Sequence, residues 1–150
     1  LVTDIYSKKI MGYAYADHMK AELVVDALKM ARKNSQFHFK EVIHHSDRGI
    51  QYCCPAFSDY AEKNGFQLST TQQYDPYENA VAERVNGILK YEFGLKNSIK
   101  NQDIARKMIQ QSIRIYNEKR LHWSLNFKTP NEVHSNYNQA EYISYKRKVA

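Results

Sequence analysis

The sequence predicts a mixed α/β domain, and three observations support that class. Of the 150 residues, 43% are hydrophobic and 25% are charged, as in an ordinary globular protein with a core. Short runs of β-branched and aromatic residues alternate with longer segments whose apolar residues recur at helical spacing. Strand-like segments come first and then alternate with helices, which is typical of a mixed sheet flanked by helices. The apolar runs are only a few residues long, too short to span a membrane.

The first fifty residues predict two strands, a helix and a third strand. The segments "LVTDIY" and "KIMGYAYA" predict strands joined by a turn at "SKK". Asp17 is placed to cap a helix that runs to about Asn34. Its apolar side chains fall on one stripe, formed by Leu23, Val24, Ala27, Leu28 and Ala31. The next strand is "KEVIHH", and Asp47 comes at or just past its end.

The remainder alternates again. Pro55 opens a short helix that Gly65 ends in the usual C-terminal position. The strand "FQLSTT" follows, and then a polar, turn-forming loop that contains Pro76. We expect one long helix to begin near Glu78 and another to run from about Gln102 to Tyr116.

Charge is distributed unevenly along the chain. Residues 1–83 hold 9 Lys and Arg against 11 Asp and Glu, whereas residues 84–150 hold 13 against 5. This asymmetry favours a polyanionic partner, most simply nucleic acid, bound mainly by the second half. A solvated basic surface without a partner remains open on charge alone.

The two cysteines, Cys53 and Cys54, are neighbours and give no disulfide framework, which favours a reducing cytoplasm. A zinc site built from His44, His45 and these two thiols is disfavoured because zinc ligands are normally spaced rather than contiguous. Local packing is the better interpretation of the four residues.

Two acids stand out as candidates for chemistry, Asp47 and Glu83, with 35 residues between them. On a helical wheel, Glu83 falls on a polar face, opposite an apolar side made of Val81, Val85 and Ile88. The polar face also carries a lysine, two amides and two glycines at positions that admit a large partner, namely Asn79, Asn86, Gly87, Lys90 and Gly94.

Asp47 is expected at the carboxyl end of a strand, where open α/β sheets place their ligand sites. Two carboxylates that meet repel each other, and a divalent cation removes that conflict. Oxygen ligands suit Mg²⁺ or Mn²⁺, and two such ions can serve phosphodiester chemistry. From residue types alone, the alternative is that Asp47 caps the "DRG" turn and Glu83 is a surface charge.

Four ordered motifs carry a family resemblance: "DIYSKKIMGYA", "HSDRGIQY", "ENAVAERVNGILKYE" and "YNEKRLHWSLNFKTPNEV". Together they resemble the DDE transposases of small bacterial insertion sequences, whose catalytic core is similar to that of retroviral integrase. The resemblance implies a ribonuclease-H-like integrase core over residues 1–134, with residues 135–150 as a tail of undecided role.

The resemblance also implies roles for the acids. Asp47 matches the second catalytic acid and Glu83 the third, and the family uses two Mg²⁺ or Mn²⁺ ions. Asp4 is disfavoured as the first acid, because "VTDIYSKKIMG" resembles the strand after the one that carries it. The first strand and first acid are therefore expected to be missing from this chain, which alone would be inactive.

The implied activity is cleavage of DNA with water, followed by transfer of the freed 3′-hydroxyl to a target strand. A nuclease that stops after cutting and an inactive DNA-binding fragment are the alternatives. Asn79 and Lys90, with Arg84 on the same helix, are the expected DNA contacts. The expected partners are the DNA ends and the target DNA. The protein is expected to be a dimer and to be located in the bacterial cytoplasm, at the nucleoid. His122 and Trp123 are expected to pack the C-terminal helix rather than to stack on bases.

Overall fold

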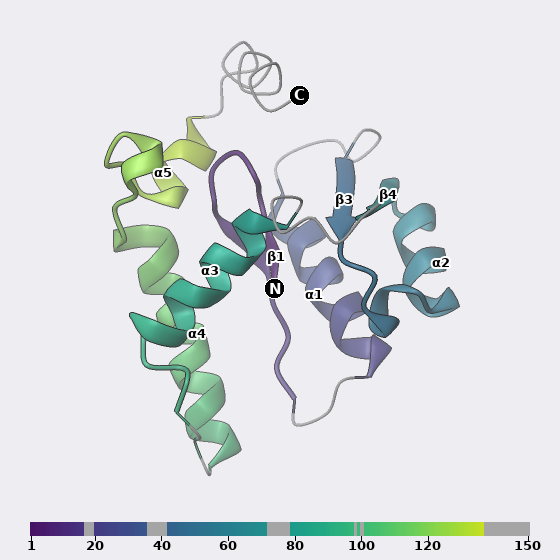
Figure 1. The fold of residues 1–150 in the computed structure, drawn as a ribbon, viewed down its shortest axis with the longest axis horizontal. Helices are drawn as coiled ribbons and strands as arrows, with labels where there is room; N and C mark the ends of the chain where they lie inside the picture. The colour runs from purple at the N-terminus through teal and green to yellow at the C-terminus, as the bar shows by residue number, and fades with distance from the viewer. Residues whose placement is uncertain (17–19, 36–41, 72–78, 98, 100, 137–150) are drawn as a thin grey trace. The chain divides into compact units, whose positions relative to one another are not determined.

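The computed structural model describes residues 1–16, 20–35, 42–71, 79–97, 99 and 101–136 (Figure 1). The chain divides into two compact units. Unit 1 comprises Leu1–Thr3 and Ile10–Asn86, and unit 2 comprises Asp4–Lys9 and Gly87–Ala150. Within the described ranges, no helix combines the length and the apolar character needed to cross a bilayer.

The first two strands are shorter than predicted. β1 (Val2–Thr3) pairs antiparallel with β2 (Ile10–Gly12), and residues 4–9 connect them. The strand expected over "LVTDIY" ends early because the Asp4 carboxylate accepts the backbone N–H groups of Tyr6 and Ser7, at 3.3 and 3.1 Å. A short polar side chain that captures nearby amides in this way competes with strand pairing.

Helix α1 (Ala21–Asn34) packs on β2 at backbone distance. A Cβ atom on Gly12 would lie 2.0 Å from the carbonyl oxygen of Ala27, so only glycine permits this approach. Ala27, Leu28 and Ala31 are buried, which confirms the predicted apolar stripe. The predicted cap Asp17 lies outside the described residues, and the helix begins after Lys20 without a side-chain cap.

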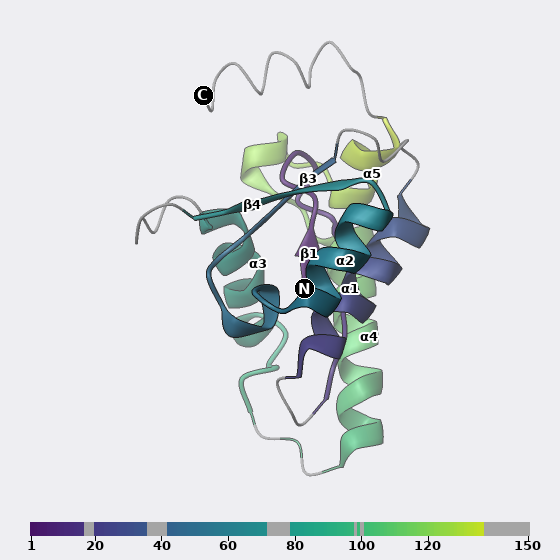
Figure 2. The same ribbon diagram turned by 90° about the vertical axis from the view of Figure 1, so that its right-hand side faces the viewer.

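A parallel strand pair forms the other sheet of unit 1. β3 (Val42–Ser46) pairs with β4 (Phe66–Thr70) from Val42 opposite Phe66 to Ser46 opposite Thr70, and both views place the strands side by side (Figures 1 and 2). Helix α2 (Pro55–Lys63) connects them, as parallel strands require. Its start at Pro55 and the left-handed φ of 79° at Gly65 confirm the predicted ends. One buried cluster of this unit consists of Leu28, Phe57, Ala61 and Phe66.

Three helices follow: α3 (Ala80–Tyr91), α4 (Gln102–Lys119) and α5 (Pro130–Ser135). α4 starts where predicted because the Asn101 side chain accepts the N–H groups of Asp103 and Ile104, at 2.9 and 3.1 Å. It continues past the predicted end at Tyr116 to Lys119. The prediction that Gly94 lies on the helical face of Glu83 is wrong, because α3 ends at Tyr91 and Gly94 has a φ of 70°.

Helix α5 gives a physical reason for the Thr-Pro pair of the fourth motif. The Thr129 hydroxyl accepts the N–H of Glu132 at 3.2 Å, and the Glu132 carboxylate accepts the N–H of Thr129 at 2.7 Å. This capping box pairs two N–H groups at the start of the helix. Pro130 fits the first helical position because its fixed φ is helical and it has no N–H to satisfy.

Candidate active site

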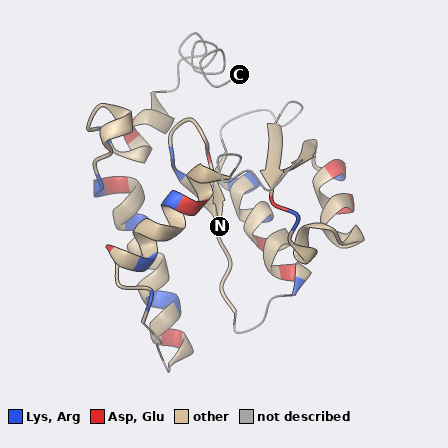
Figure 3. Ribbon diagram, in the orientation of Figure 1, with Lys and Arg blue, Asp and Glu red and all other residues tan. Residues whose placement is uncertain are grey.

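Asp47 directly follows the carboxyl end of β3, as predicted. Its side chain is exposed, and its Oδ1 accepts the backbone N–H of Gly49 at 3.0 Å. Past the end of β3, Figure 3 shows a red acidic segment followed by a blue basic one, in agreement with the sequence order of Asp47 and Arg48. The strand end and the local hydrogen bond together hold the carboxylate in a defined turn at the edge of the sheet.

The turn is tied to the end of the neighbouring strand. Arg48 Nε donates to the carbonyl oxygen of Thr71 at 2.9 Å, and the N–H of Thr71 donates to the carbonyl oxygen of Ser46 at 3.2 Å. Arg48 therefore has a structural role in the turn, in agreement with the interpretation of "DRG" as a tight turn. The polar, turn-forming loop predicted around Pro76 falls in residues 72–78, which lie outside the described residues.

Gly49 leaves space for the Asp47 carboxylate. A Cβ atom on Gly49 would lie 3.0 Å from Asp47 Oδ1 and 2.7 Å from the side-chain nitrogen of Gln51. The pKa of the Tyr52 phenol is raised. Burial is the larger cause, and the negative charge of Asp47 is the second.

Glu83 lies near the start of α3 with its side chain exposed, and its N–H donates to the carbonyl oxygen of Asn79 at 3.1 Å. The opposite side of the helix is apolar and faces the interior, because Val85, Ile88 and Leu89 are buried. The predicted division of α3 into a polar and an apolar side is thus confirmed.

The three predicted DNA contacts all belong to the region of α3. Asn79 immediately precedes the helix and is half-buried, whereas Arg84 and Lys90 are exposed on it. Gly87 lies on the same helix, and a Cβ atom there would meet nothing within 4 Å. Open space next to Gly87 leaves this part of the helix accessible to a large ligand.

Asp47 and Glu83 belong to the same compact unit. Within the described residues, no group of three or more His, Cys, Asp or Glu side chains could hold a metal ion. Asp47 and Glu83 each present an exposed carboxylate, the type of ligand that Mg²⁺ takes together with waters and phosphate oxygens.

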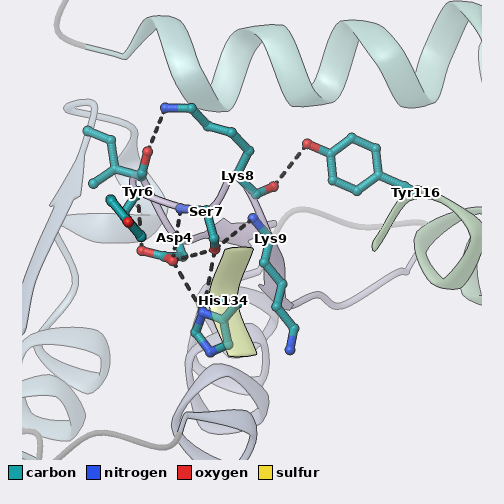
Figure 4. A network of polar contacts seen from close by, with 8 residues as sticks. Asp4, Tyr6, Ser7, Lys8, Lys9, Tyr116 and His134 are labelled. Carbon is teal, nitrogen blue, oxygen red and sulfur yellow. Dashed lines mark hydrogen bonds and ion pairs between the residues drawn. The ribbon is translucent and has the colours of Figure 1, made fainter. Parts of the chain in front are cut away.

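Asp4, the disfavoured first acid, takes part in a different network, in unit 2 (Figure 4). Its Oδ2 accepts a hydrogen bond from the Ser7 hydroxyl and lies 3.3 Å from Nδ1 of buried His134 in α5. Burial acts to raise the pKa of Asp4, but hydrogen bonds from His134 and Ser7 outweigh it, so the pKa is lowered. These contacts anchor the turn of residues 4–9 to α5.

A pocket of about 80 Å³ in unit 1 is lined by residues of both sheets. Val2 of β1 and His44 of β3 line it, together with Leu23, Val24 and Ala27 of α1. Burial first, and then the charge of His45, lower the pKa of His44 to about 4.

His44 Nε2 is buried without a hydrogen-bond partner among the described residues, whereas exposed His45 lies 3.0 Å from the Ser69 hydroxyl. The His44 ring lies near the rings of Tyr52 and Phe57, whose centroids are 6.2 and 5.4 Å away.

Comparison with known families gives a consistent result. Two family profiles, both described as integrase core domain, match residues 1–76 and residues 64–130. A Mycobacterium tuberculosis protein of insertion sequence element IS986/IS6110 is 39% identical over 95 residues, which cover 61% of this chain and 34% of that protein.

Two proteins from Shigella sonnei align over most of the chain. An uncharacterized 31 kDa protein of insertion element IS600 is 35% identical over 92% of this chain and 51% of its own length. The transposase for insertion sequence element IS629 is 30% identical over 91% of this chain and 45% of its own length. The chain thus spans between a third and about half of these relatives.

Among solved structures, a chain of a simian T-cell lymphotropic virus intasome in complex with the PP2A regulatory subunit B56 gamma matches with a TM-score of 0.66. The match covers 84% of this chain and 44% of the other, at 18% identity. At that identity the likeness establishes the fold alone, which is the ribonuclease-H-like integrase core that the motifs predict.

Proposed function

Since the chain belongs to the integrase core family of DDE transposases, we propose that it forms the catalytic core with which a transposase cleaves DNA and joins the freed end to a target strand. The observation that carries the proposal is the placement of the two acids within unit 1. Asp47 follows the parallel strand β3 in a turn where its carboxylate accepts the Gly49 N–H, and Glu83 lies on the exposed side of a helix whose other side is buried.

In this proposal Asp47 and Glu83 hold Mg²⁺ or Mn²⁺. A pair of such ions, about 3.5–4 Å apart, would activate the attacking oxygen and stabilise the leaving oxygen of an in-line displacement. The chain supplies the positioning: the N–H of Gly49 orients the Asp47 carboxylate, and the buried apolar side of α3 keeps Glu83 directed away from the core.

Asn79, Arg84 and Lys90 are proposed to contact the DNA next to the acids. The excess of basic residues in the second half supports a wider phosphate contact, with basic residues recurring along α4 (Figure 3). If the proposal holds, affinity for DNA falls steeply with salt, by roughly one log–log unit per phosphate contact. Because two DNA ends must be brought together, we propose that the active form is a dimer.

The pocket between β1 and β3 supports a further part of the proposal, concerning the first acid. Asp4 is engaged with Ser7 and His134, which leaves it a structural role. We propose that an extended segment from outside residues 1–150 lies between β1 and β3, completes the sheet and brings the first catalytic acid. The 150-residue chain alone is then expected to be inactive.

The test is the Asp47→Asn variant of the full-length transposase, assayed on a labelled transposon end with Mg²⁺. Removing one metal-binding carboxylate is expected to lower both cleavage and strand transfer by at least about a hundredfold. Asp59→Asn is a matched control, because Asp59 is an exposed acid on α2 of the same unit. Wild-type strand transfer by the Asp47 variant would contradict the proposal.

The same assay separates the proposed activity from its alternatives. Joined DNA products identify a transposase, whereas nicked or shortened DNA without joined products identifies a nuclease of the same fold. Binding without cleavage by the full-length protein, with or without chelator, identifies an inactive DNA-binding core. Chelation of divalent ions with EDTA should abolish cleavage by the wild type if the acids act through a metal.

A further inference from the structure

The segment between α4 and α5 folds into a compact loop held by its own backbone. The N–H of His122 donates to the carbonyl oxygen of Lys128 at 3.1 Å, and the N–H of Phe127 donates to the carbonyl oxygen of His122 at 2.9 Å. The loop is anchored by buried side chains, since His122 and Leu125 are buried and the His122 ring meets the Tyr116 ring edge-on at 5.1 Å.

The same loop directs two aromatic side chains outward. Trp123 is 81% exposed and Phe127 is 59% exposed, and their rings contact each other edge to face with centroids 5.0 Å apart. The expectation that His122 and Trp123 both pack on the core is therefore right for His122 and wrong for Trp123. The buried residues His122 and Leu125 already anchor the loop. The exposed aromatic pair is therefore not needed to hold the loop in place, and we look for its role in binding.

The backbone conformation strengthens this conclusion. Asn126 and Phe127 both have left-handed backbones, with φ of 54° and 58°. Asparagine tolerates this region, but a bulky residue adopts it rarely and at a cost in conformational energy. The loop thus holds the Phe127 ring beside Trp123 in a conformation that phenylalanine does not prefer.

The charge around the pair indicates the class of ligand. Residues 114–128 contain four basic residues and one acid, a balance of +3. Lys119 and Lys128, at the two ends of the loop, are exposed. Lysine is depleted in protein–protein interfaces, whereas exposed aromatic rings beside positive charge are typical of surfaces that bind single-stranded nucleic acid.

We propose that Trp123 and Phe127 form a stacking platform for an unpaired DNA base, with Lys119 and Lys128 contacting the adjacent phosphates. The inference rests on the proposed function in taking DNA as the ligand, and it adds that the bound DNA carries an unpaired or displaced nucleotide. Such a platform binds the flat face of a base, which all four bases have. It would therefore not distinguish one base from another by its hydrogen-bonding edge.

The protein offers a direct readout, because Trp123 is the sole tryptophan of the 150 residues. Its fluorescence can be followed while chain 1–150 is titrated with a 12-nucleotide thymidine single strand, with an abasic strand of the same length and with a blunt duplex. We expect base-bearing single strands to quench the fluorescence, and abasic strands to bind through their phosphates without quenching.

Variants refine the test. Trp123→Ala is expected to weaken binding of the thymidine strand about tenfold, as the loss of one stacked base implies, and to leave duplex binding unchanged. Trp123→Phe should recover most of the affinity, which a charge or folding defect would not allow. Tyr91→Ala is the matched control, because Tyr91 is an exposed aromatic residue of the same unit beside Lys96, whose Nζ lies 5.2 Å from its ring.

Three results would overturn the platform. One is unchanged tryptophan fluorescence while a labelled strand binds. Another is equal quenching by the abasic strand, and the third is a fluorescence change that depends on protein concentration without DNA, which would indicate a protein interface. In each case loss of cleavage in Asp47→Asn would leave the proposed function standing, whereas absence of any DNA binding would count against both.

Discussion

At the scale of single residues, the candidate site depends on the close contact between Gly49 and the Asp47 carboxylate. Asp47 Oδ1 accepts the Gly49 N–H at 3.0 Å, and a Cβ atom on Gly49 would stand equally close to the same oxygen. The side chain of Gln51 can move away from such a Cβ, and the Asp47 carboxylate would have to shift by a few tenths of an ångström, which would disturb its hydrogen bond to the Gly49 N–H. Glycine at position 49 is therefore part of the positioning of the acid.

If Asp47 binds the metal as proposed, Gly49→Ala is predicted to reduce DNA cleavage by the full-length transposase about tenfold, because the displaced carboxylate loses productive geometry. Its free energy of unfolding should change little, since the turn is at the surface. The two quantities are measured by a cleavage assay and by urea unfolding. Equal cleavage by the variant and the wild type would show that the Gly49 N–H does not position Asp47.

Asp4 offers a test of the second polar network, through the pH dependence of stability. Its pKa is lowered in the folded chain, because the hydrogen bonds from His134 and Ser7 outweigh burial. A carboxyl group with a depressed folded pKa stabilises the fold above its unfolded pKa, near 3.8. That contribution is lost as the pH falls through the lower, folded value.

Asp4→Asn is therefore predicted to lower the free energy of unfolding at pH 7 by about 1.5–3 kcal/mol, the usual range for a charged hydrogen bond. The difference from the wild type should shrink as the pH falls below 3.8. Urea unfolding at a series of pH values measures both effects. Asp26→Asn is the control, because Asp26 pairs with Lys29 at the exposed surface, where such a pair contributes little. A pH-independent difference would contradict the assignment.

At the scale of elements, the sequence predicts those parts whose ends are encoded by local chemistry. The ends of α2 at Pro55 and before Gly65, and the start of α4, follow from proline, glycine and cap residues. Strands β1 and β2 were predicted but are shorter than expected, and β1 ends early because the Asp4 side chain captures the amides of Tyr6 and Ser7. Likewise, nothing in the pattern of "RLHWSL" distinguishes buried His122 from exposed Trp123.

Helix α3 contains a glycine that lowers its stability but could allow DNA to approach its exposed side. Gly87 lies within the helix, and a Cβ atom there would meet nothing within 4 Å. Gly87→Ala is thus predicted to raise the free energy of unfolding by about 0.5–1 kcal/mol, the difference in helix propensity. If DNA approaches this side of the helix closely, the same change should weaken DNA binding, because the methyl group occupies the approach.

Urea unfolding and a DNA-binding titration of Gly87→Ala measure the two effects independently. Asn86→Ala is a suitable control, because Asn86 is an exposed helical neighbour whose replacement also raises helix propensity but adds no bulk. A stabilised Gly87→Ala variant that binds DNA as well as the wild type would indicate that the glycine does not serve close approach of a ligand.

At the scale of the whole molecule, the motifs predict the family and the fold, but the division of the strands into two pairs comes from the structure. In the described residues, β1 pairs with β2 and β3 pairs with β4, in separate two-stranded sheets. Val2 of β1 and His44 of β3 line one pocket, where the buried Nε2 of His44 has no partner within the described part. Two-stranded sheets are marginal by themselves, so a strand between them would gain backbone pairing on both sides.

The last prediction follows from this arrangement. Amide groups on the β1 and β3 edges next to the pocket should exchange their hydrogens quickly in chain 1–150, and slowly in the full-length transposase if an added strand pairs with them. Exchange in the paired segment of β4 should be similar in both proteins and serves as the internal control.

Protection that appears in chain 1–150 only at high concentration would mean that a second copy inserts a strand there. Equal, fast exchange in both proteins would contradict the inserted strand, and the first acid would then have to be supplied from another place in the fold.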